Sequence, residues 1–187
     1  MTGTKNAALR EARGLLQQFG YNGFSFQHVA DAVGVRKPSL YQHFESKEAL
    51  GRALLAEYAR SFREWAQTVA VFPPREKLAA LFELYGAFAQ RSAQVCPLST
   101  LLSDFNSLPK ALRAELRVLV RFQETWLEGV LREGQRAKIF RKDMSARGLA
   151  HLALSLGLGA QLGARSGSRG AAQLRAAARD FLRLIAS

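Results

Sequence analysis

Apolar residues recur at intervals of three to four along nearly all of this 187-residue chain. Strand-like alternation of apolar and polar residues never extends beyond a few positions. The spacing is that of helices with a buried face, whereas a half-buried strand needs a period of two. We therefore predict an all-α fold. A hydrophobic content of 48% suffices to fill the core of a chain of this length.

Glycines, prolines and capping residues divide the pattern into about nine helices. Ser25 and Ser46 are suitable N-caps, Gly20 and Gly34 are helix stops, and Pro73-Pro74 forces a break. The predicted helices cover about residues 4–19, 25–33, 38–44, 46–69, 99–106, 109–130, 145–165 and 171–185, together with a fifth helix that carries apolar residues over 78–88 and ends near Cys96-Pro97.

The segment from Ser25 to Phe44 has the pattern of two short helices packed across a tight turn. Gly34 takes the turn conformation, and Ala30 is small where the helices cross. The small core behind the turn is predicted to consist of Val29, Val35, Leu40 and Phe44. In such helix-turn-helix units the second helix enters the major groove of DNA, and the first helix lies across the phosphate backbone.

Polar side chains project from this unit and suit base edges and phosphates. The candidate DNA contacts are Ser25, Gln27, Arg36, Lys37, Ser39, Tyr41, Gln42, His43 and Lys47. Three of them, Ser25, Gln27 and Lys47, are expected at positive helix ends, where phosphates bind. An ordinary solvated surface would explain the same residues. We favour DNA contacts, because a helix this short is marginally stable by itself and is rarely built only to be exposed to solvent.

The net charge of +12 favours a nucleic-acid partner, but its distribution matters more than its size. Residues 1–50 hold six basic and four acidic side chains, whereas residues 108–187 hold fifteen and six. The excess therefore lies outside the helix-turn-helix. This excess of positive charge indicates either solvated outer faces of several helices or a basic protein that binds DNA without sequence preference.

Residues 20–50, GYNGFSFQHVADAVGVRKPSLYQHFESKEAL, resemble the N-terminal signature of the TetR family of transcriptional repressors. The resemblance covers about residues 5–55. It implies a helix-turn-helix domain over residues 1–48 and a ligand-binding and dimerisation domain over residues 49–187. It also implies a homodimer formed through the eighth and ninth helices, which binds a palindromic operator in double-stranded DNA and is released by a small-molecule inducer. Arg36, Pro38 and His28 depart from the usual signature, which affects the expected operator sequence and not the mode of binding.

Aromatic residues on the remaining helices could line an apolar pocket between them. The candidate ligand contacts are Phe62, Trp65, Tyr85, Phe88, Phe105, Phe122 and Trp126, together with Cys96. Each aromatic residue is individually better explained as core, because it lies on an apolar helical stripe.

Cys96 is the single cysteine. The stretches around it, residues 95–98 and 108–113, resemble a cysteine-containing branch of the TetR family that includes the repressor of the N-ethylmaleimide reductase gene and acrylate-responsive regulators. That resemblance implies an electrophilic inducer. The alternative is a small buried hydrophobe, because a reactive thiol needs both access and a lowered pKa.

Other functional classes have little support in the sequence. A single cysteine excludes an intrachain disulfide, and the N-terminus lacks the apolar stretch of a signal peptide, so we expect a cytoplasmic location. The longest apolar run, residues 148–163, is too short for a membrane span. No metal, cofactor or nucleophile motif is evident, and residues 157–163 lack the glycine spacing of a dinucleotide loop. We expect no enzyme and no cofactor.

Overall fold

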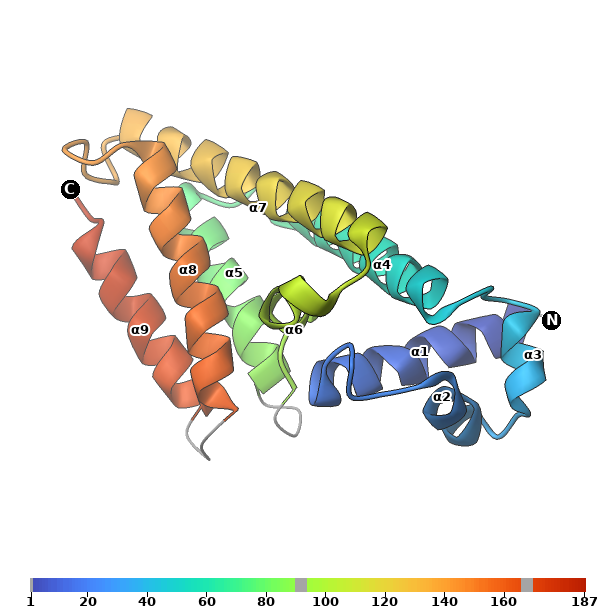
Figure 1. Ribbon diagram of the computed structural model, residues 1–187. Coiled ribbons are helices and arrows are strands. Elements are labelled where there is room, and N and C mark those ends of the chain that lie inside the picture. Colours follow the sequence, from blue (N-terminus) through green and yellow to red (C-terminus); the bar gives the residue numbers. More distant parts are fainter. Residues whose placement is uncertain (1, 90–93, 166–169) are drawn as a thin grey trace. The chain divides into compact units, whose positions relative to one another are not determined.

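The computed structural model describes residues 2–89, 94–165 and 170–187 (Figure 1). These residues form nine α-helices and one 3-10 helix, with a single isolated antiparallel bridge between Phe140 and Ala186. The prediction of an all-α chain with about nine helices is confirmed. The elements are α1 (Thr2–Phe19), α2 (Phe26–Val33), α3 (Lys37–Tyr41), α4 (Lys47–Thr68), α5 (Pro74–Ala89), α6 (Pro97–Ser103), η1 (Phe105–Ser107), α7 (Lys110–Arg136), α8 (Ala146–Ala164) and α9 (Gly170–Leu184).

Serine hydroxyls cap three helices where the local sequence favours a start. The hydroxyl of Ser25 accepts the His28 amide at 3.3 Å, that of Ser46 accepts the Ala49 amide at 3.1 Å, and that of Ser145 accepts the Gly148 amide at 3.0 Å. Each bond satisfies one of the first-turn amides that have no partner within the helix.

Several element boundaries differ from those predicted, and α7 continues to Arg136, six residues beyond its predicted end. Helix α3 ends at Tyr41 and not at residue 44, because the amides of His43 and Phe44 both turn back to the carbonyl of Leu40 at 2.9 Å. Helix α5 begins at Pro74, whose missing amide has no helical partner in any case, and residues 94–96, the predicted end of this helix, are not helical. The predicted sixth helix divides into α6 and η1.

The chain forms two compact units, and the first joins Met1–Phe62 with Pro97–Val118. Within it α1 contacts both α2 and α6, and α2 contacts α3. Its core includes Leu16 of α1 and Leu40 of α3, with Leu101 of α6 and Leu112 of α7 from the distant segment. This unit is larger than the predicted 1–48 domain, because residues 97–118 complete its core.

The second unit joins Arg63–Cys96 with Leu119–Ser187. Helices α5, α8 and α9 contact one another within it. Helix α8 can lie close to α5 because Gly157 faces the ring of Tyr85. A Cβ at that glycine would be 2.4 Å from a ring carbon. Tyr85 is completely buried as a result.

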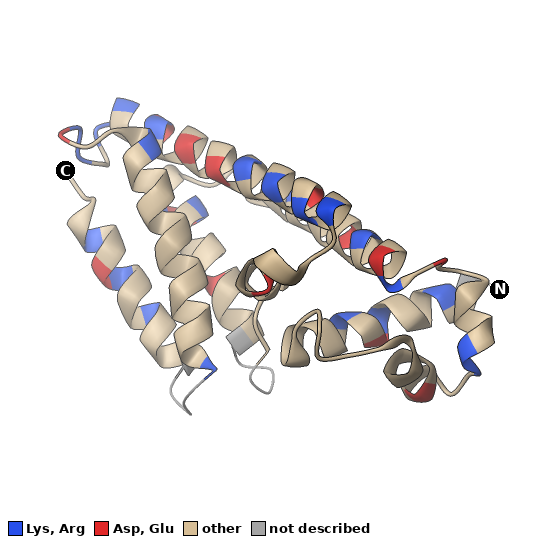
Figure 2. Cartoon of the chain, in the orientation of Figure 1, with Lys and Arg blue, Asp and Glu red and all other residues tan. Residues whose placement is uncertain are grey.

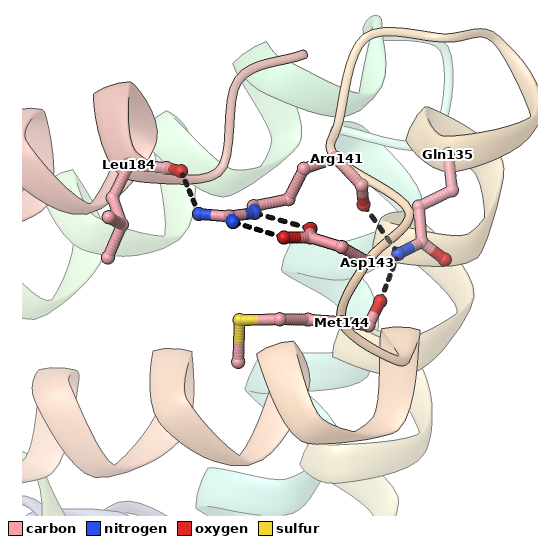
Figure 3. A network of polar contacts seen from close by, with 5 residues as sticks. All are labelled: Gln135, Arg141, Asp143, Met144 and Leu184. Carbon is pink, nitrogen blue, oxygen red and sulfur yellow. Dashed lines mark hydrogen bonds and ion pairs between the residues drawn. The ribbon is translucent and has the colours of Figure 1, made fainter.

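A polar network fastens the end of α9 to the loop between α7 and α8 (Figure 3). The side-chain amide of Gln135 donates to the carbonyls of Arg141 and Met144, both at 2.8 Å. The guanidinium of Arg141 forms a bidentate ion pair with Asp143 and donates to the carbonyl of Leu184 at 3.3 Å. Arg141 therefore both orders its own loop and caps the C-terminal end of a helix.

Candidate functional site

The turn between α2 and α3 is built around Gly34, which adopts a left-handed conformation with φ 76° and ψ 31°. The amide of Gly34 donates to the carbonyl of Asp31 at 3.2 Å, and the amide of Val35 donates to that of Ala30 at 3.0 Å. These two bonds form a Schellman-type helix end, which favours glycine because a left-handed residue with a Cβ is strained. The predicted role of Gly34 is confirmed.

A small apolar core lies behind the turn. Val29, Ala30 and Leu40 are completely buried, and Phe44 nearly so. Val35, which was predicted to join them, is only half-buried. The packing holds α3 against α2 and so fixes the backbone from which the outward side chains of α3 project.

The outward face carries most of the predicted DNA contacts. Arg36, Lys37 and Gln42 are exposed, while Ser39 and His43 are half-buried. Figure 2 shows the positive charge of this face on and beside α3. The side chains supply cationic, amide and hydroxyl groups of the kinds that read base edges and phosphates.

Tyr41 has a second role in the packing of α3. Its ring centroid lies 4.9 Å from that of the buried Phe26, yet 49% of its surface is exposed. One side of the ring therefore stabilises α3 against α2, which leaves the phenol edge for solvent or a ligand.

Two of the predicted contacts at the start of α2 have partners within the unit. Ser25 serves as the N-cap of the helix. Gln27 is exposed, and its amide donates to the carboxylate of Asp31 at 2.7 Å, one turn further along. A phosphate contact by Gln27 would compete with this exposed bond.

The side chain of Lys47 is partly buried. Its ammonium donates to the carbonyl of Phe24 at 2.6 Å and lies 4.7 Å and 4.8 Å from the ring centroids of Tyr21 and Phe24. Burial lowers the pKa of Lys47, and the nearby Asp104 partly opposes that shift. The structure thus gives Lys47 a role in joining α4 to the loop before α2; its predicted phosphate contact remains a prediction.

The loop after α1 is held by residues from the distant segment 97–118. The carboxylate of Asp104 accepts the Tyr21 amide at 2.6 Å, and Asn22 donates to Ser107 at 2.6 Å. Gly20, with φ 82°, passes so close to Asp104 that a Cβ would lie 2.8 Å from its carboxylate oxygen. Sequence reasoning missed Asp104, because no local pattern relates residues 83 positions apart.

The eight candidate ligand residues are divided between the two units. Phe62 and Phe105 belong to the first. The others, Trp65, Tyr85, Phe88, Cys96, Phe122 and Trp126, belong to the second.

Among the six in the second unit, the structure brings Trp65 and Trp126 together, with ring centroids 5.3 Å apart. It places the guanidinium of Arg63 over the ring of Phe122 at 5.3 Å. Trp65, Phe122, Trp126 and Phe88 are all half-buried.

Tyr85 and Cys96 lie in a buried cluster of uncharged polar groups. The hydroxyl of Tyr85 donates to the side-chain carbonyl of Gln123 at 3.2 Å. The backbone amide of Cys96 donates to the side-chain carbonyl of Gln161 at 2.8 Å. Burial, with a smaller electrostatic contribution from the neighbouring Cys96, raises the pKa of Tyr85 well above its ordinary value. Both glutamines were missed by sequence reasoning, although each interrupts a mainly apolar helical stripe and could have been noticed there.

An open groove of about 770 Å³ lies between α7 and α8. Its lining includes Arg121, Glu124, Glu128, Arg147 and His151, so it is polar and of mixed charge. The predicted aromatic residues do not line it. In the part of the chain that the structure describes, no three metal-ligating side chains gather in one place, and no helix is long and apolar enough to cross a membrane.

Comparison with known proteins finds two family matches that together cover most of the chain. The family described as "Bacterial regulatory proteins, tetR family" matches residues 8–54, and the family described as "Tetracyclin repressor-like, C-terminal domain" matches residues 74–182. The gap between the matches contains the second half of α4.

Individual relatives resemble the chain over much of its length. The HTH-type transcriptional repressor DhaR of Mycobacterium sp. (strain GP1) is 29% identical over 76% of this chain and 73% of its own. A solved TetR-family regulator from Agrobacterium tumefaciens superposes with a TM-score of 0.94 at 27% identity, covering 100% of this chain and 99% of its own. The reduced form of E. coli NemR shares the fold, with a TM-score of 0.83 at 23% identity over 98% of both chains.

Proposed function

The chain belongs to the TetR family of bacterial transcriptional regulators, and we propose that it represses genes by binding a palindromic operator as a homodimer that a small-molecule inducer releases. The observation that carries the proposal is the rigid turn at Gly34, which presents α3 with Lys37, Tyr41 and Gln42 outward. A fixed helix of this kind can place side chains against base edges in the major groove.

The surface of α8 supports a homodimer. The sequence of this helix holds one arginine and one histidine among nineteen residues, and Figure 2 shows it almost without charge, in contrast to α7. Leu152 is 44% exposed and Leu162 39% exposed, and Gly159 lies between them in the sequence. Exposed leucines around a small residue favour close packing against another helix.

On α9, Leu184 is 61% exposed. A second copy of the chain would bury these residues in a self-complementary contact, as two-fold symmetry requires. We therefore assign dimerisation to α8 and α9.

A basic protein without sequence preference is the less favoured alternative. Helix α7 carries charges of both signs along its length (Figure 2), and several arginines are paired, as in Arg132 with Glu128 and Arg52 with Glu115. Paired and interspersed charges provide less attraction for a phosphate backbone than a continuous basic surface does.

The burial of Cys96 favours an inducer that binds without covalent chemistry. Its side chain is 0% exposed, whereas an electrophile must reach the thiolate sulfur. An electrophilic inducer would require the surrounding helices to open before the reaction.

The test of DNA recognition is selection of an operator from random duplexes with the full-length protein, followed by anisotropy titrations. A repressor should bind the selected duplex roughly a thousandfold or more tightly than random DNA at the same salt concentration. Lys37→Ala should lose most of this preference, whereas Lys142→Ala, an exposed lysine of the second unit, should keep it. Equal affinity for selected and random DNA would refute the proposal.

The homodimer is tested by sedimentation of two matched variants. Leu152→Asp should give a monomer with greatly weakened operator binding, because a carboxylate would be buried without a partner in the interface. Val71→Asp, at an even more exposed apolar position, should remain dimeric. A dimeric Leu152→Asp variant would remove α8 from the interface.

A further inference from the structure

Gln161 occupies the inner face of α8 and is completely buried. Its side-chain carbonyl accepts the backbone amide of Cys96 at 2.8 Å. Because that amide can only donate, the atom facing it must be the oxygen of the carboxamide. The orientation of the Gln161 side chain is therefore set by its partner, and the nitrogen points elsewhere.

The nitrogen Nε2 of Gln161 has no hydrogen-bond partner among the described residues. It carries two N–H donors, and both are enclosed by protein. Folded proteins pair nearly all such buried groups, so an unpaired buried amide indicates an acceptor that the described residues do not provide.

The buried polar groups of α5, the helix that packs against this part of α8 at Gly157, carry no unpaired charge. Tyr85 stays a neutral phenol because burial raises its pKa well above the ordinary value, and its hydroxyl donates to Gln123. The charge of the buried Lys77, on the same helix as Tyr85, is already matched by Glu133, 2.8 Å away. An ionised ligand would lose its hydration here without gaining a counter-charge.

We propose that the inducer is a small uncharged molecule whose carbonyl-type oxygen accepts hydrogen bonds from Nε2 of Gln161. The proposal rests on the ligand response proposed above and adds the chemical class of the ligand and the residue that recognises it. Gly157, one turn before Gln161, leaves the ring of Tyr85 close to the same face of α8. The ring gives the ligand an apolar neighbour beside its polar contact.

The test uses matched probes and the full-length protein without DNA. Two ketones, acetophenone and cyclohexanone, are each compared with the alkene of the same shape, α-methylstyrene and methylenecyclohexane, and acetophenone is also compared with benzoate. Binding is measured as the concentration-dependent rise in the midpoint of thermal unfolding. At least one ketone should raise the midpoint, whereas its alkene and benzoate should not.

The contribution of Gln161 is tested with Gln161→Met, which keeps the length of the side chain and removes both donors. It should weaken ketone binding at least tenfold, whereas Gln67→Met, at an exposed glutamine of α4, should leave it unchanged. Any one of four results would overturn the proposal. These are equal binding of a ketone and its alkene, binding of benzoate as strong as that of acetophenone, no ketone binding at all, and full ketone binding by Gln161→Met.

The comparison of ketone with alkene uses the wild-type protein, so it decides the question even if Gln161→Met does not fold. Failure of this proposal would leave operator binding intact. Failure of the proposed repressor function would appear in the DNA titrations instead, so the two failures are distinguishable.

Discussion

Replacing Gly34 with alanine should destabilise the protein, whereas the same replacement at Gly14 should stabilise it. Both glycines have open space where a Cβ would be added, with no atom within 4 Å apart from those of the adjacent residues and of the surrounding helix backbone. They differ in backbone conformation, because Gly34 has φ 76° and Gly14 lies within the regular helix α1. The pair therefore isolates the effect of the backbone from that of packing.

The expected magnitude follows from two opposing contributions. A left-handed residue with a Cβ is strained by about 1–2 kcal/mol. The lower conformational entropy of the unfolded alanine chain offsets about 0.4–1 kcal/mol of that strain. Gly34→Ala should therefore lose about 1 kcal/mol of folding free energy, whereas Gly14→Ala should gain about 0.5–1 kcal/mol.

Urea unfolding followed by circular dichroism measures both changes, at one fixed protein concentration because the proposed dimer makes stability concentration-dependent. With a slope of about 2–3 kcal/mol per molar urea, Gly34→Ala should lower the midpoint by about 0.4 M. Gly34→Asn should lose less, because asparagine tolerates the left-handed region better. Midpoints that shift in the same direction for Gly34→Ala and Gly14→Ala would refute the backbone argument.

Three further results are expected. The thiol of Cys96 should react slowly with N-ethylmaleimide in the native protein and quickly in urea, because it is fully buried; equally fast reaction in both conditions would show that the thiol is accessible. Gly157→Ala should destabilise the protein by about 1–3 kcal/mol, since the added methyl overlaps the ring of Tyr85; calorimetry measures the change, and unaltered stability would mean that the ring moves freely. Arg141 lowers the pKa of Asp143, so the ion pair should stabilise the fold above the ordinary carboxyl pKa and lose this contribution as the pH falls through the lowered value; an NMR titration of Asp143 should therefore have its midpoint below 3.8 in the wild type and nearer to it in Arg141→Met.

The features predicted well from the sequence are those set by neighbouring residues. The caps at Ser25 and Ser46 and the turn at Gly34 depend on contacts between residues a few positions apart, so the local sequence is sufficient to predict them. The second role of Lys47 was not predictable, because its partner carbonyl lies 23 residues earlier. Pairing across such a distance depends on how helices pack, and side-chain spacing along one helix does not report it.

The candidate ligand residues show the same contrast between what neighbouring residues determine and what distant contacts determine. The aromatic stripes indicate which helix faces are apolar, but they do not show which residues meet. Phe62 and Phe105 belong to one compact unit and the other candidates to the second. Gln161 binds an amide 65 positions away. A glutamine on an apolar helix can be recognised in the sequence. Its unpaired side-chain nitrogen, on which the ligand proposal depends, is evident only in the folded structure.

The bond from Asp104 to the Tyr21 amide has a consequence for protein engineering and for the exchange of parts between relatives. The unit that carries α3 is assembled from two separate stretches of the gene, because Leu101, Leu112 and Asp104 complete it from beyond residue 96. A hybrid regulator that takes only the first 62 residues from one parent would join mismatched halves of one core. Transplanting a new DNA specificity should therefore succeed by exchanging the exposed residues of α3, or by moving both stretches together.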